Sequence, residues 1–175
     1  MPLEHLWATW RSAYVGQVAD TRSLPSEAEA DGRSLFERIL AGADEEGDEA
    51  AGIVHRGATC FVLLNLFPYT SGHLMVLPNR AVADLEGLTA EEDDELWATV
   101  RSAVMALKAG LRCDAVNVGL NLGHAAGGSQ SEHLHVHCVP RWSGDANFVS
   151  VTAETRVLPI SLAEVGERLR AAWPA

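Results

Sequence analysis

Hydrophobic residues recur at helical spacing near the start, in the middle and at the end of the chain. The first such segment predicts an amphipathic N-terminal helix, because residues three and four apart share one helix face. Its apolar positions are Leu3, Leu6, Trp7, Trp10 and Tyr14. A shorter helix is expected over 34–40. The acidic run 42–50 is expected to be a solvated loop, since it is rich in charge and glycine.

The period changes from helical to extended after residue 51. Apolar and β-branched runs over 52–55 and 59–66 predict a β-hairpin, and a turn sequence then leads to a third strand over 73–77. Two more strands are predicted over 115–122 and 133–139. Because short turns join consecutive strands, we expect a mainly antiparallel sheet.

Two further helices are predicted between and after these strands. Thr89 and Glu92 have the spacing of a capping box, and the apolar stripe after them predicts a long helix that ends at Gly110. The stripe consists of Leu96, Val100, Ala103, Val104 and Leu107. A last helix opens at Ser161. About five strands with two or three helices make an α+β domain.

The composition is typical of one compact domain, with 47% hydrophobic and 21% charged residues among 175. A formal net charge of −11 disfavours nucleic acids and membrane surfaces as partners, because both are anionic. No apolar run approaches the roughly 18 residues of a membrane span. The first residues also lack the basic start of a secretory signal. We therefore expect a cytoplasmic protein.

The three cysteines of the chain are widely spaced, and each lies among apolar residues. They are Cys60, Cys113 and Cys138. This pattern favours reduced thiols in the core over a disulfide framework or a zinc site.

Four of the seven histidines lie between His124 and His137, and His133, His135 and His137 alternate along one predicted strand. Residues two apart on a strand share a face at a spacing of about 6.5–7 Å, so the three imidazoles should line one side. A merely solvated face has no reason to use histidine three times. A facial zinc site with an open position is the sharper alternative. However, no carboxylate alternates in this strand to orient the imidazoles.

A glycine-rich loop precedes the histidines and adds a candidate anion site. In Gly127-Gly128-Ser129, the glycines allow backbone N–H groups to approach a phosphate closely, and the serine hydroxyl adds a donor. An ordinary hairpin loop is the alternative interpretation. Beside three histidines, phosphate binding is favoured.

The stretch 133–139 has the form His-φ-His-φ-His-φ-φ, where φ is apolar, and so resembles the signature of the histidine-triad (HIT) nucleotide hydrolases and transferases. Matching segments are 64–65, 72–78, 117–122 and 140–148. Within the family, the chain looks most like bacterial, particularly actinobacterial, diadenosine polyphosphate phosphorylases and hydrolases. The resemblance implies a histidine-triad nucleotide-binding core over 51–150. We therefore divide the rest of the chain into an N-terminal helix and acidic linker (1–50) and a C-terminal strand and helix that extend the same domain (151–175).

The resemblance also implies a reaction. His135 would attack the α-phosphorus of a dinucleoside polyphosphate such as diadenosine tetraphosphate, giving a covalent nucleotidyl-histidine that phosphate or water resolves. The carbonyl of His133 would hold Nδ1–H of His135, and His137 would donate to a phosphate oxygen as the leaving group departs.

Further site residues follow from the same resemblance. Asn65 matches a ribose position, and Asn121 matches a polar position beside the phosphates. Ordinary turn chemistry is the alternative for both. His73 matches a histidine that orients the triad, with a packing role as the alternative. The N–H groups of the glycine loop would meet the phosphoryl oxygens. His5, His55 and His124 stay unassigned, and Trp142 and Phe148 are expected in the core or a dimer contact.

Two departures from the family pattern bear on cofactor and subgroup. Many bacterial relatives hold zinc through a Cys-x-x-Cys pair, a ligand after the third strand and the first triad histidine. The first three places are here Ser34, Glu37 and Ala81. We therefore expect no structural zinc and no tightly bound cofactor, only Mg²⁺ carried by the nucleotide. Ser129 stands where many eukaryotic dinucleoside hydrolases have glutamine, which favours the phosphorylase-like group.

Several alternatives stay open at this point. A nucleoside phosphoramidase would use the same residues, a nucleotide-binding regulator would not turn over, and a metal-dependent hydrolase would lose activity on chelation. The resemblance implies a homodimer, with a tetramer as the alternative. The nucleobase, the phosphate chain length and the acceptor are not determined.

Overall fold

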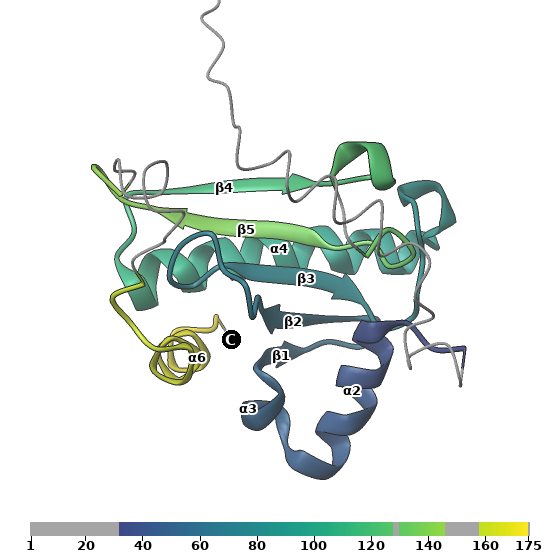
Figure 1. Ribbon diagram of the computed structural model, residues 1–175, viewed down its shortest axis with the longest axis horizontal. Helices are drawn as coiled ribbons and strands as arrows, with labels where there is room; N and C mark the ends of the chain where they lie inside the picture. Colours follow the sequence, from purple (N-terminus) through teal and green to yellow (C-terminus); the bar gives the residue numbers. More distant parts are fainter. Residues whose placement is uncertain (1–31, 128–129, 146–157, 175) are drawn as a thin grey trace, which may run out of the picture.

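The computed structural model describes residues 32–127, 130–145 and 158–174 (Figure 1). Its five strands form one sheet in the order β1-β2-β3-β5-β4, and every neighbouring pair is antiparallel. The strands are β1 (Ile53–Arg56), β2 (Cys60–Leu64), β3 (Leu74–Pro78), β4 (Ala115–Leu120) and β5 (Val136–Arg141). The expected antiparallel sheet is confirmed.

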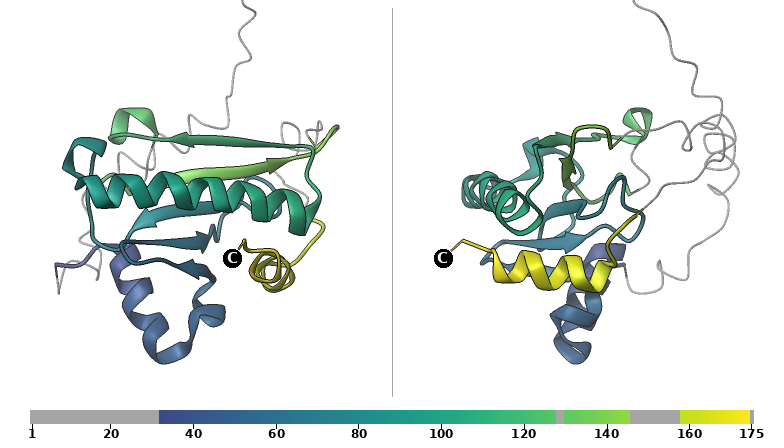
Figure 2. Two further views of the ribbon diagram at one scale, coloured as in Figure 1. Left: turned by 180° about the vertical axis from the view of Figure 1, so that it is seen from behind. Right: turned by 90° about the vertical axis from the view of Figure 1, so that its left-hand side faces the viewer.

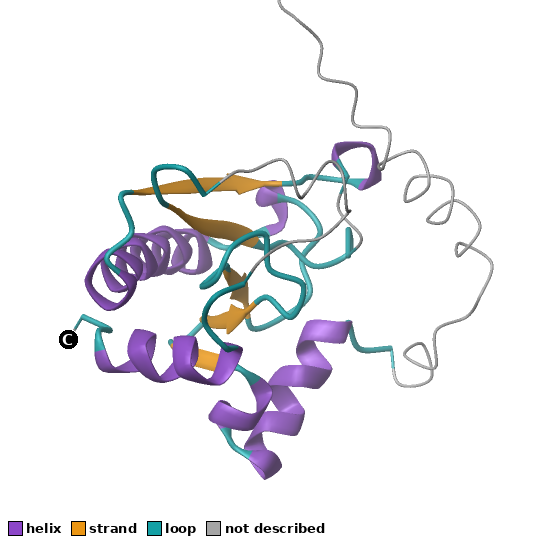
Figure 3. Cartoon of the chain, turned by 60° about the vertical axis from the view of Figure 1, so that its left-hand side comes forward, coloured by secondary structure: helices purple, strands orange, loops and turns teal. Residues whose placement is uncertain are grey.

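The helices of the described residues lie on both faces of this sheet. They are α2 (Leu35–Glu46), α3 (Asp48–Ala51), α4 (Ala90–Leu111) and α6 (Leu162–Ala171). Short 3₁₀ turns occur at Leu85–Gly87 and His124–Ala126. Figure 3 shows α4 and the α2–α3 pair on opposite sides of the strands. None of the helices in these ranges is long and apolar enough to cross a membrane. The predicted N-terminal helix and Phe148 lie outside the described residues.

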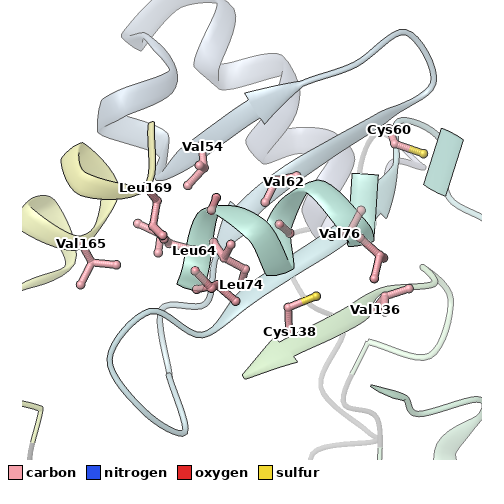
Figure 4. Close-up of a cluster of buried hydrophobic side chains, with 14 of the residues drawn as sticks. Val54, Cys60, Val62, Leu64, Leu74, Val76, Val136, Cys138, Val165 and Leu169 are labelled. Atoms are coloured by element: carbon pink, nitrogen blue, oxygen red, sulfur yellow. The ribbon is translucent and has the colours of Figure 1, made fainter. Parts of the chain in front are cut away.

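The larger core lies between the sheet and the helices α4 and α6 (Figure 2). Figure 4 shows the strand side chains that meet there, including Val62, Leu74, Val76 and Cys138. From the predicted α4 stripe, Leu96, Val100, Ala103 and Leu107 are buried as expected. Val104 is only partly buried, and Thr99 and Ala106 are buried in addition. All three cysteines are buried free thiols, as predicted.

The predicted capping box of α4 is confirmed, but the predicted C-terminal end of this helix is wrong. The hydroxyl of Thr89 accepts from the backbone N–H of Glu92, and the Glu92 carboxylate accepts from that of Thr89. The helix continues through Gly110 and ends at Leu111, followed by the C-cap residue Arg112, whose φ is 52°. A Cβ at Gly110 would lie 2.9 Å from the carbonyl oxygen of Arg168. Glycine is therefore needed there because α6 packs closely against it.

A smaller core lies between α2 and the β1–β3 half of the other sheet face. Phe36 and Ala43 of α2 pack with buried side chains of these strands, which are Ile53, Phe61, Leu63, Met75 and Leu77. Most of this half of the sheet is thereby covered, although Leu63 and Met75 also border the cavity described below. The β5–β4 half is left to form the wall of a cavity.

The acidic run 42–50, predicted to be a loop, is mostly helical. It forms the second half of α2 and most of α3. Arg56 of β1 binds the carboxylates of Asp44 and Asp48 at 2.8 and 2.7 Å, so part of the charge is paired with the sheet. Asp48 and Glu49 also lie in the first turn of α3, where the helix dipole favours acidic side chains.

Several predicted strand boundaries also differ, and the fifth strand runs through Pro140 to Arg141 instead of ending at residue 139. The second strand ends at Leu64 and the fourth at Leu120, two residues earlier than predicted in each case. The fifth begins at Val136 rather than His133, because Leu134 donates its N–H to the carbonyl of Val82 instead of a strand partner. His133 and His135 therefore lie before the first residue of β5 that pairs with a neighbouring strand.

Candidate active site

A cavity of about 1840 Å³ lies against the β5–β4 half of the sheet. Its wall also includes parts of α2, α6 and the loop after β2. Five residues singled out by the sequence line it, namely Asn65, Asn121, Gly127, His135 and His137. His73 and His133 lie behind this lining and are 1% and 0% exposed. Gly128 and Ser129 lie outside the described residues.

The alternation of residues along β5 places the histidines at the cavity. Val136 and Cys138 are fully buried in the core beneath α4, so His135 and His137 project to the other face. The rings of His135 and His137 meet edge to face, with centroids 4.8 Å apart. His133 lies on the same face as expected, but it is fully buried and absent from the cavity wall, because it packs against Phe36 with ring centroids 5.4 Å apart.

The tautomer of His135 follows from one hydrogen bond. Its Nδ1 lies 2.8 Å from the carbonyl oxygen of His133. A carbonyl can only accept, so Nδ1 carries the proton and Nε2 keeps its lone pair. Phe36 packs against the same ring with centroids 5.6 Å apart and restricts its rotation. The arrangement presents an unprotonated imidazole nitrogen at the cavity wall.

A second chain of hydrogen bonds fixes the proton of His137. The backbone N–H of Tyr69 and the amide of Asn65 both approach Nδ1 of His73, at 3.2 and 3.4 Å, so this nitrogen accepts. Nε2–H of His73 then donates to Nδ1 of His137 at 2.9 Å. In this tautomer His137 carries its proton on Nε2, which lies 3.3 Å from the amide nitrogen of Asn121; both groups are donors, so they make no hydrogen bond to each other. Burial is the main cause that lowers the pKa of His137 to about 4, and the charge of the nearby His135 is the second cause.

Several polar residues at the cavity were not identified from the sequence. The ring of Tyr69 packs against that of His73 at a tilt of 39°, with centroids 4.6 Å apart. Arg141 and Arg170 are lining residues with guanidinium groups, which suit anionic ligands. Arg141 is paired with Asp145 at 2.7 Å, and Arg170 donates to the carbonyl of Ile53 at 3.1 Å. Arg170 is distant from the histidines in sequence, whereas Tyr69 and Arg141 lie only a few residues from His73 and His137 but carry no motif of their own.

The remaining candidates are placed away from the reacting groups. His55 stacks on Trp173 with centroids 4.7 Å apart and is absent from the cavity wall. His124 contacts the hydroxyl of Ser131 at 2.9 Å. Trp142 is partly buried against the larger core, as one of its two expected roles requires.

Comparison with known proteins identifies the family. A family model described as the HIT domain matches residues 46–144. The chain belongs to the HIT family. It is 42% identical over 171 residues to a Mycobacterium tuberculosis protein named AP-4-A phosphorylase, covering 98% of this chain and 85% of that protein. A Schizosaccharomyces pombe protein named Bis(5'-nucleosyl)-tetraphosphatase (asymmetrical) is 33% identical over 93 residues, which are 53% of this chain and 50% of that one.

Solved structures support the same assignment of this HIT chain. A Zn-bound histidine triad family protein from Mycobacterium smegmatis superposes with a TM-score of 0.64 and 29% identity, covering 79% of this chain and 91% of that one. The resemblance stated from the triad sequence is thereby confirmed, as is the HIT-like α+β fold.

The residues at the family's zinc positions do not fit a zinc ion in this HIT chain. Both ring nitrogens of His133 are engaged, Nδ1 by the hydroxyl of Ser34 at 2.7 Å and Nε2 by the carbonyl of Pro78 at 2.9 Å. The carboxylate of Glu37 accepts from backbone N–H groups, and Ala81 offers no side-chain ligand. Across 32–127, 130–145 and 158–174, no group of three or more His, Cys, Asp or Glu residues is arranged to hold a metal.

Proposed function

We propose that this HIT protein transfers a nucleotidyl group from a dinucleoside polyphosphate to phosphate or water, through a covalent adduct on His135. The observation that carries the proposal is the hydrogen bond from Nδ1 of His135 to the carbonyl of His133, which leaves a nucleophilic Nε2 at the cavity. The 42% identity to the AP-4-A phosphorylase of Mycobacterium tuberculosis supports diadenosine tetraphosphate as the substrate.

In the first step, Nε2 of His135 forms a bond to the α-phosphorus, and the bond from that phosphorus to the bridging oxygen breaks. The bridging oxygen leaves with the electron pair and accepts a hydrogen bond from Nε2–H of His137. The carbonyl of His133 stabilises the positive charge on the nucleotidyl-imidazole through Nδ1–H. With diadenosine tetraphosphate, the first product is ATP.

In the second step, an oxygen of phosphate or water attacks the same phosphorus, and the N–P bond breaks with its electron pair returning to Nε2. Phosphate gives ADP, and water gives AMP with release of a proton of the attacking water to solvent. Asn65 at the ribose, Asn121 beside the phosphates and the loop 127–129 at the phosphoryl oxygens complete the proposed site. Asn121 and Gly127 line the cavity beside His137 and His135, which supports these roles.

The full chain, incubated with diadenosine tetraphosphate, tests the proposal. We expect ADP and ATP with phosphate, AMP and ATP without it, and an acid-labile nucleotidyl adduct in rapidly quenched samples. His135→Asn should lower turnover by about 10⁴-fold or more. His55→Asn, away from the cavity, is the matched control and should retain turnover. Undiminished turnover in His135→Asn would refute the mechanism. Comparing kcat/KM on a nucleoside phosphoramidate separates the phosphoramidase alternative.

The proposal includes a homodimer, with a tetramer as the alternative, and Mg²⁺ bound only through the nucleotide. The strand β4 supports the first part, because it is an edge strand whose Asn117, Val118 and Gly119 are exposed and available for pairing. Light scattering on the purified chain tests the oligomer. A chelator that abolishes turnover, with recovery on zinc but not on magnesium, would contradict the second part.

A further inference from the structure

The backbone that holds the proposed nucleophile is not part of the sheet ladder. β5 begins at Val136, directly after His135. The preceding residues are fastened to the end of β3 and to the segment after it, since His133 contacts the Pro78 carbonyl through Nε2 at 2.9 Å and Leu134 donates its N–H to the carbonyl of Val82 at 2.6 Å. The position of the His133 carbonyl, which orients His135, therefore depends on contacts other than strand pairing.

One of these contacts comes from the start of α2. The Pro78 carbonyl can only accept, so Nε2 of His133 carries the proton. Burial lowers the pKa of the His133 imidazole, which keeps the ring neutral and leaves Nδ1 as an acceptor. The hydroxyl of Ser34, 2.7 Å away, therefore donates to Nδ1. His133 is 0% and Ser34 8% exposed, so water does not replace this bond.

The Ser34 hydroxyl is itself held by the capping box of α2. Its oxygen accepts from the backbone N–H of Glu37 at 3.1 Å, which directs the hydroxyl proton toward His133. The Glu37 carboxylate accepts from the N–H of Ser34 at 2.8 Å and from that of Ala81 at 3.0 Å. The hydrogen bond from the Ser34 N–H is the largest of the causes that keep the pKa of Glu37 below its usual value. Four residues from three segments thus form one continuous chain of hydrogen bonds.

We propose that Ser34 and Glu37 are positioning residues for the nucleophile, acting through His133. The chain Ala81–Glu37–Ser34–His133 fixes the rotation of the His133 peptide, and its carbonyl in turn fixes the tautomer of His135. This inference rests on the proposed function of His135. The hydrogen-bonded cluster lies at the positions that hold zinc in many bacterial relatives, where this chain has no set of zinc ligands.

The chain contains a matched control for this proposal. The capping box of α4 has the same pair of hydrogen bonds, between Thr89 and Glu92. The carboxylate of Glu92 binds Arg80 at 2.6 Å. Among the described residues, no histidine contacts the Thr89 hydroxyl. Loss of either cap should destabilise its helix to a similar extent. Only loss of the Ser34 hydroxyl should change the orientation of His135.

The test compares Ser34→Ala with Thr89→Ala in turnover of diadenosine tetraphosphate. We expect Ser34→Ala to lower kcat by about 10- to 100-fold with KM unchanged, Ser34→Thr to restore it, and Thr89→Ala to keep the wild-type kcat. Glycine is tolerated at a helix N-cap, so Ser34→Gly serves if the alanine variant folds poorly. Equal kcat in Ser34→Ala and Thr89→Ala would overturn the proposal.

A second readout needs no turnover and separates this inference from the proposed function. Long-range ¹H–¹⁵N correlation spectra of the histidine rings report which nitrogen carries the proton. We expect His135 protonated on Nδ1 in the wild type and in Thr89→Ala, and a mixture of tautomers in Ser34→Ala. An unchanged His135 tautomer in Ser34→Ala would overturn the positioning role. If the tautomer shifts while no substrate is turned over even by the wild type, the proposed function fails and the positioning role stands.

Discussion

On the face of the sheet covered by α4 and α6, the side chains of β2, β3 and β5 are apolar and closely packed, whereas on the opposite face β5 presents His137 to a cavity. The two faces share the same strands. Because neighbouring residues alternate between faces, burial of Val136 and Cys138 on one side sets the position of His137 on the other. The packed face thereby acts as the rigid support for the chemical face.

The helices explain why only one face is open. The helix α4 has 22 residues and packs against strands β2, β3 and β5, whereas α2 has 12 and covers the β1–β3 half alone. Phe36 of α2 marks the boundary, since it packs in the smaller core and also against His135. The cavity therefore begins where the short helix α2 stops covering the sheet.

The largest expected effect that separates the two faces is on stability. Leu107 of α4 is fully buried in the larger core. Leu107→Ala should lower the free energy of unfolding by about 2–5 kcal/mol, because the lost burial and the remaining cavity both cost energy. Urea unfolding measures this change, and kcat of the folded fraction should stay at the wild-type value. A loss of kcat as large as that of His135→Asn would contradict the division into a supporting and a chemical face.

A smaller effect should appear in the pH dependence of stability. The folded-state pKa of His137 is lowered from 6.5 to about 4, so between these values the unfolded chain binds more protons than the folded one. The contribution of His137 to the free energy of unfolding is therefore fully present above pH 6.5. It decreases as the pH falls toward 4, by up to about 1.4 kcal/mol per pH unit. His137→Asn should reduce this slope in urea unfolding between pH 4 and 6.5.

The buried His133 makes a related contribution, because burial also lowers its pKa. The slope should therefore fall in His137→Asn without vanishing. His124→Asn is a suitable control, since this histidine is exposed and contacts Ser131. A His137→Asn slope equal to that of the wild type would show that His137 is not held neutral by the fold.

Local patterns in the sequence predicted much of this arrangement. The capping box at Thr89, the α4 stripe and the alternation of His135 and His137 depend only on residues within a few positions of each other. The long helix, five strands and two cavity histidines could therefore be predicted. Ser161 likewise opens α6 as predicted.

The features that the sequence did not predict depend on contacts between distant residues. Ser34 and His133 are 99 residues apart, and nothing local to either indicates their hydrogen bond. Gly110 allows the close approach of α6 rather than ending α4, and the acidic run pairs with Arg56 of β1. Such pairings become visible only when the chain is folded.

The smallest expected effect concerns the end of α2 that is remote from the histidines. Asp44 pairs with Arg56 at 2.8 Å, but its side chain is 69% exposed. Asp44→Asn should lower the free energy of unfolding by about 0.2–1 kcal/mol, because solvent screens exposed ion pairs. Turnover should not change, since only the N-terminal end of α2 reaches His133. Comparison with Ser34→Ala in the same assay sharpens this point. A kcat loss in Asp44→Asn would mean that the whole of α2, rather than its N-terminal cap, sets the position of the nucleophile.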